Sequence, residues 1–159
     1  MKKIRITKYK QLHFAVRLFL GGLMLMSGAT ATAQIAGLTV ISNQVGSPPS
    51  LKFSELKSIF MGEQQRWRSG TKITIALMKT NTSAGKSTSK ILYGMSGDEL
   101  NKFWLALVFQ GKAPAPNFFN SAAELENFVA QNPGAIGILD QVGANDDIKT
   151  ILVEGRRSL

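Results

Sequence analysis

The chain has 159 residues, no cysteine and a single histidine, and its formal net charge is +9 at pH 7. The lack of cysteine excludes disulfides, thiol chemistry and Cys/His zinc sites, and because the one histidine is His13, the rest of the chain has no Ser-His-Asp or Cys-His centre. Residues 34–159 carry thirteen basic and ten acidic residues, scattered along the sequence, which is not the dense basic footprint of a nucleic-acid-binding protein.

The N-terminal segment has the layout of a secretory signal peptide. Basic residues up to Arg17 precede a mostly apolar stretch that begins at Leu18, and Ala31-Thr32-Ala33 supplies a small-x-small cleavage pattern. The apolar stretch is shorter than the roughly 20 residues that span a bilayer. We therefore expect a signal peptide at residues 1–33, cleaved on export to the periplasm, and a single domain at residues 34–159 with no transmembrane span. An uncleaved anchor or a surface helix is the alternative interpretation.

The first half of the domain alternates strand and helix signals. A β-rich run, Leu38–Ile41, precedes a Gly/Pro/Ser loop at residues 46–50. An amphipathic pattern from Ser54 then predicts a short helix that stops at Gly62. Apolar and polar residues alternate over Ile73–Leu77, which predicts a half-buried strand.

Two helices are expected next. Thr82 or Ser83 can cap a helix over Ala84–Tyr93, closed near Gly94. Ser96 and Glu99 form the pattern of a capping box for the following helix, which stops at Gly111. Its expected buried stripe has i, i+3, i+4, i+7 and i+8 spacing and consists of Leu100, Phe103, Trp104, Leu107 and Val108.

The last part of the chain contains a loop, a helix and two strands. Residues 112–119 contain prolines and predict a loop, after which Ser121 and Glu124 suggest a second capping box for a helix that ends at Asn132-Pro133-Gly134. Strands are expected at Ala135–Leu139 and Ile148–Val153. Strands that alternate with helices predict an α/β fold with a three-layer arrangement, a sheet with flanking helices.

Few carboxylates in the domain have an arrangement typical of chemistry. No pair has a spacing recognisable from general acid–base catalysis, so we expect a non-catalytic protein without a cofactor. The adjacent pair Asp146-Asp147 follows Gly143-Ala144-Asn145 but lacks the alternating acidic spacing of a calcium loop. A polar turn is expected there, and no metal site is predicted.

The residues between the strand at 73–77 and the next helix are the candidate binding site. Gly85-Lys86-Ser87 is similar to the end of a nucleotide-binding P-loop, but the glycine needed five positions earlier is replaced by Thr80. A helix N-terminus flanked by hydroxyl and amide groups can instead hold a phosphate, sulfate or carboxylate. The predicted ligand-binding residues are Thr80, Asn81, Thr82, Ser83 and Gly85. Lys79 and Lys86 either add charge to this site or are simply solvated.

The aromatic residues have two interpretations each. Trp67 lies between Arg66 and Arg68, where it can cover the sheet edge or act as a stacking platform, and core packing is the favoured interpretation. Trp104 is expected in the core. Phe118-Phe119 can either plug the core or form part of a contact surface.

Several short motifs, in order, resemble a known family. These are Leu56 to Gly62 followed by Trp67 and Gly70, then Tyr93-Gly94-Met95-Ser96, Phe103-Trp104, Phe109-Gln110-Gly111, and Pro133-Gly134-Ala135-Ile136-Gly137-Ile138. Their order and spacing resemble those of the phosphate-binding periplasmic receptors of ABC transporters. The resemblance implies one lobe of the type II solute-binding fold.

The resemblance also implies a ligand and a site. The stretch Thr80–Ala84 is similar to the family's D-G-S-G-T segment, but only Thr82 keeps the hydroxyl chemistry of the serine, and both glycines and the acid are absent. The implied ligand is phosphate or another small anion, and a homodimer or a periplasmic or membrane protein partner would be needed to enclose it. The alternative hypothesis is a periplasmic interaction or assembly module that has lost solute binding.

Overall fold

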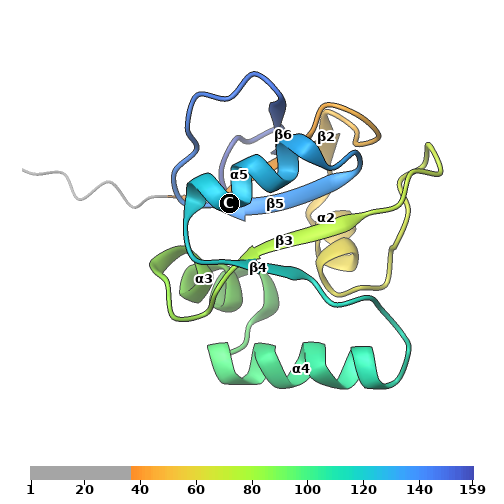
Figure 1. Cartoon of the computed structure of the whole chain (residues 1–159), viewed down its shortest axis with the longest axis vertical. Helices are drawn as coiled ribbons and strands as arrows, with labels where there is room; N and C mark the ends of the chain where they lie inside the picture. The colour runs from red at the N-terminus through yellow and green to blue at the C-terminus, as the bar shows by residue number, and fades with distance from the viewer. Residues whose placement is uncertain (1–36) are drawn as a thin grey trace, which may run out of the picture. The chain divides into compact units, whose positions relative to one another are not determined.

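A computed structural model describes residues 37–159, and the predicted signal peptide lies outside the described residues. Residues 37–159 form one compact unit (Figure 1), and its two clusters of buried apolar residues lie between Leu38 and Val153. This region therefore has a hydrophobic core of its own, as an independently folding domain requires. None of the helices in residues 37–159 is long and apolar enough to cross a membrane.

A six-stranded mixed sheet forms the middle of the domain, in the order β2-β6-β1-β5-β3-β4. β1 pairs antiparallel with β5 and β6, β3 pairs parallel with β5 and β4, and β2 pairs parallel with β6. The strands are β1 (Thr39–Asn43), β2 (Ser50–Leu51), β3 (Thr74–Met78), β4 (Asn117–Phe119), β5 (Ala135–Leu139) and β6 (Ile148–Val153).

Helices cover both faces of the sheet, which confirms the predicted three-layer α/β fold. The helical segments are α2 (Phe53–Phe60), α3 (Ser83–Thr88), the π-helical turn η1 (Ser89–Tyr93), α4 (Gly97–Phe109) and α5 (Ala122–Gln131). The larger core cluster joins α2, η1 and α4 to one face of the sheet, and the other cluster joins α5 and the start of α3 to the opposite face. Figure 1 shows α4 at one end of the domain, beyond the edge strand β4.

The predicted capping residues begin α4 and α5. In α4 the capping box is complete, because the Glu99 N–H donates to the Ser96 hydroxyl at 3.3 Å and the Ser96 N–H donates to the Glu99 carboxylate at 2.7 Å. In α5 only half of the predicted box forms. Ser121 accepts from the Glu124 N–H, but the Glu124 carboxylate accepts from the backbone N–H of Asn120 instead of that of Ser121.

Several sequence predictions need correction. The predicted loops contain the short strands β2 and β4, which are held by backbone pairing to β6 and β3 and are too short to show alternation. The strand at 73–77 was predicted to be half-buried, but β3 is a central strand whose last three residues are buried because helices cover both faces.

The predicted helix over Ala84–Tyr93 divides into α3 and η1, and it ends at Gly94 in the left-handed conformation as expected. Val108 was expected in the buried stripe of α4 but is 41% exposed. Of the other residues in that stripe, Leu100 and Trp104 are buried, and Phe103 and Leu107 are partly buried against the larger core cluster.

Candidate anion-binding site

The turn between β3 and α3 is built around Thr82, the N-cap of α3. Its hydroxyl donates to the carbonyl oxygen of Lys79 at 2.8 Å and accepts from the backbone N–H of Gly85 at 3.0 Å, and its own N–H also donates to the Lys79 carbonyl oxygen. The Lys79 N–H in turn donates to the carbonyl oxygen of Phe119 in β4. Thr82 therefore fixes the path of the chain from the sheet into the helix.

This arrangement leaves backbone donors free at the helix start. Within residues 37–159, the backbone N–H groups without an acceptor at this turn are those of Thr80, Asn81, Ser83 and Ala84. The first N–H groups of a helix have no intrahelical partner, and such groups bind anions. Asn81 and Ser83 are exposed, so an anion in solution can reach them.

An open pocket of about 290 Å³ lies beside the turn, lined by Lys79, Thr80, Asn81, Asn101 and Phe118. The Asn101 amide donates to the Thr80 hydroxyl at 3.4 Å, which connects the turn to α4. None of the lining residues is acidic, and Lys79 supplies a positive charge. The pocket thus combines polar groups with one cation and suits a small anion.

Gly85 and Lys86 lie apart from this pocket. Gly85 is buried, and a Cβ atom there would lie 2.0 Å from the carbonyl oxygen of Lys79, so the missing side chain allows α3 to approach the end of β3. Its N–H is already donated to Thr82. Lys86 lines a different open pocket together with Lys90.

Two pocket residues were not predicted as ligand-binding residues. Asn101 comes from α4 and Phe118 from β4, so both reach the turn only through the tertiary fold. The sequence contains only a weak indication for Asn101. It lies on the same face of the predicted helix as the apolar Leu105 and Val108, which follow it by four and seven residues. Phe118 packs partly against the larger core cluster and also lines the pocket, so it fits both interpretations of Phe118-Phe119.

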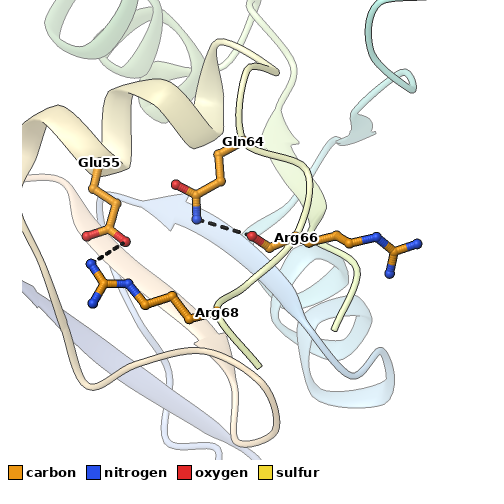
Figure 2. A network of polar contacts seen from close by, with 4 residues as sticks. All are labelled: Glu55, Gln64, Arg66 and Arg68. Carbon is orange, nitrogen blue, oxygen red and sulfur yellow. Dashed lines mark hydrogen bonds and ion pairs between the residues drawn. The ribbon is translucent and has the colours of Figure 1, made fainter. Parts of the chain in front are cut away.

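The Arg66-Trp67-Arg68 segment does not form a stacking platform. Trp67 is 3% exposed and its indole N–H donates to the Gly134 carbonyl oxygen at 2.9 Å, which confirms core packing. Figure 2 shows the two arginine side chains extending in different directions: Arg68 reaches Glu55 of α2 at 3.9 Å, and the Arg66 carbonyl oxygen accepts from Gln64. The ion pair is solvent-exposed on the arginine side, so it contributes little to stability.

Comparison with known proteins identifies the fold. No family model matches the sequence, and a comparison with curated proteins found no match. The structure is similar to an ABC-type phosphate transport receptor from Vibrio cholerae, with 18% identity, a TM-score of 0.61, and coverage of 77% of this chain and 48% of that chain. It is also similar to PstS from Borrelia burgdorferi, with 15% identity, a TM-score of 0.54, and coverage of 76% and 48%.

A third similar structure is a phosphate-binding protein from Stenotrophomonas maltophilia, with 15% identity, a TM-score of 0.57, and coverage of 75% of this chain and 39% of that chain. The domain therefore has the fold of part of a phosphate-receptor structure. The chain spans about half or less of the length of these proteins, as expected for a single lobe.

Proposed function

We propose that the chain is an exported, non-catalytic solute-binding protein that holds phosphate or a related oxyanion at the β3–α3 turn, for transport or sensing. The observation that carries the proposal is the group of free backbone N–H donors beside a pocket that contains Lys79 and no acidic lining residue. Similarity to structures named as phosphate receptors supports the same ligand. The signal-peptide pattern of residues 1–33 supports export to the periplasm.

The geometry divides the predicted site residues into two groups. Thr82 and Gly85 use their hydroxyl and N–H groups within the turn, so their role is to shape it. Thr80, Asn81 and Ser83 have backbone N–H groups that can donate to an oxyanion, and charge-assisted bonds of this kind are roughly twice as strong as neutral ones. The Lys79 ammonium adds attraction at the pocket wall.

Thermal unfolding of residues 34–159 in phosphate and in sulfate, at fixed ionic strength, tests the proposal. A ligand at a hundred times its Kd contributes about 2.7 kcal/mol to the free energy of unfolding, which raises the melting temperature visibly. Lys79→Gln should reduce the rise, whereas Lys57→Gln on the exposed side of α2 should leave it unchanged. If neither anion stabilises the wild-type protein at saturating concentration, anion binding is wrong and the alternative, a periplasmic interaction module, gains support.

A further inference from the structure

One flank of α4 carries apolar side chains that the domain leaves exposed. Leu105 is 58% exposed, Val108 41% and Phe109 83%, and their spacing of three and four residues places them together on the helix. We call these three residues the α4 patch. Adjacent large apolar side chains with this exposure mark an interaction surface.

The α4 patch continues into the candidate anion site. An apolar groove of about 240 Å³ beside α4 is lined by Leu105 and Val108 and also by Asn101 and Phe118. The last two residues line the anion pocket as well. A molecule that covers the groove would therefore lie directly against the open side of the anion pocket.

We propose that a second copy of this chain covers the α4 patch and supplies the missing wall of the anion pocket. The assignment to a second copy rests on charge complementarity. Asp98 precedes Leu105 by seven residues, and Lys112 follows it by seven, just beyond the end of α4. Both are exposed, and neither forms an ion pair within residues 37–159. Two α4 helices packed antiparallel about Leu105 bring Asp98 of each copy toward Lys112 of the other.

Such an arrangement is self-complementary, which is what a two-fold symmetric dimer requires. The apolar residues pack at its centre and the charges lie at its rim, which is the usual anatomy of an interface. The contribution to ligand binding rests on the function proposed above. Pockets enclose most of a ligand's surface, whereas this pocket is open, so an anion held by one copy alone remains largely in water.

Sedimentation velocity tests the dimer with residues 34–159. The wild-type protein should pass from monomer to dimer between about 1 and about 200 µM, the concentration range expected of a weak, reversible self-association through three exposed apolar side chains. Leu105→Glu and Phe109→Glu place a charge within the α4 patch and should give a monomer whose melting temperature matches that of the wild type at about 1 µM, where the wild type is also monomeric. The matched control is Val45→Glu, because Val45 is also 58% exposed but lies outside the α4 patch, and this variant should still dimerise.

A wild-type monomer across this range, or equal dimerisation of Leu105→Glu and Val45→Glu, would overturn the proposal. The α4 patch would then bind a different partner.

Phosphate titration separates the dimer proposal from the proposed function. The neutral variant Phe109→Gln, whose position lines neither the groove nor the anion pocket, should also be monomeric and should bind phosphate at least about tenfold more weakly than Val45→Gln, because it lacks the second wall. A dimer that does not bind phosphate contradicts the proposed function and its ligand but not the dimer itself, whereas a Phe109→Gln monomer that binds phosphate as tightly as Val45→Gln contradicts only the second-copy wall.

Discussion

The Thr82 hydroxyl donates to the carbonyl oxygen of Lys79 at 2.8 Å. The side chain that the family resemblance singled out as a ligand contact is therefore hydrogen-bonded within the turn itself. The Thr82 hydroxyl oxygen also accepts from the Gly85 N–H at 3.0 Å. One residue thus joins the end of β3 to the first turn of α3. The free donors beside it are backbone N–H groups, which no substitution at position 82 removes directly.

Thr82→Ala should destabilise the domain by about 1 kcal/mol, because it removes the N-cap of α3. Thr82→Ser keeps the hydroxyl and should retain most of that stability. Urea unfolding of the two variants measures the difference. Equal loss in both would show that the threonine methyl group, and not the cap, stabilises the turn.

Gly85→Ala should be more harmful than the loss of the cap. The new Cβ would lie 2.0 Å from the carbonyl oxygen of Lys79, a backbone atom that cannot move without shifting β3. Overpacking of this kind costs about 1 to 3 kcal/mol or more. Lys86→Ala, in the same helix but exposed, should change the free energy of unfolding little. A melting temperature of Gly85→Ala equal to that of Lys86→Ala would contradict the close approach of α3 to β3.

Much of the fold could be predicted because local patterns and tertiary packing agree. The strands Ala135–Leu139 and Ile148–Val153 have the predicted bounds, and the capping residues Ser96 and Ser121 begin their helices. β2 and β4 could not be predicted, since strands of two and three residues depend on their pairing partners and show no periodicity.

The site was only partly predictable for a similar reason. The turn itself is local, so Thr80 and Asn81 could be found as pocket residues from strand, polar turn and helix signals. Asn101 and Phe118 enter the pocket from α4 and β4, and sequence alone does not show which distant elements meet there. Nor does a sequence show that the Thr82 hydroxyl turns back to a carbonyl oxygen.

The capping box of α4 makes part of the stability dependent on pH. The hydrogen bond from the Ser96 backbone N–H lowers the pKa of the Glu99 carboxyl. A carboxyl whose pKa is lowered by folding stabilises the native state above its unfolded pKa, and this contribution is lost as the pH falls through the folded pKa. Glu99→Gln should therefore lower the melting temperature at neutral pH, and the difference from the wild type should shrink in acid. Thermal unfolding from neutral pH down to below the ordinary glutamate range checks this, and a constant difference would contradict it.

Tyr93 connects η1 to the end of α2 by a buried hydrogen bond. Its hydroxyl donates to the Phe60 carbonyl oxygen at 2.8 Å, and burial raises the pKa of the phenol. Tyr93→Phe leaves that buried carbonyl oxygen without this donor, which costs about 1 to 3 kcal/mol. Chemical unfolding measures the loss. A change within experimental error would indicate that water or another donor replaces the hydroxyl.

The central claim is that an anion binds in the pocket beside the β3–α3 turn. The most direct test is calorimetric titration of phosphate into three proteins: the wild type, Asn101→Asp and Asn127→Asp. Both substitutions replace an exposed helical asparagine with an acid, but only Asn101 lines the pocket. A carboxylate close to a bound anion repels it by about 1 kcal/mol or more, which corresponds to a loss of about fivefold or more in affinity. We predict weaker phosphate binding in Asn101→Asp and wild-type affinity in Asn127→Asp. Equal affinity in all three proteins, or no binding to the wild type, would contradict the account.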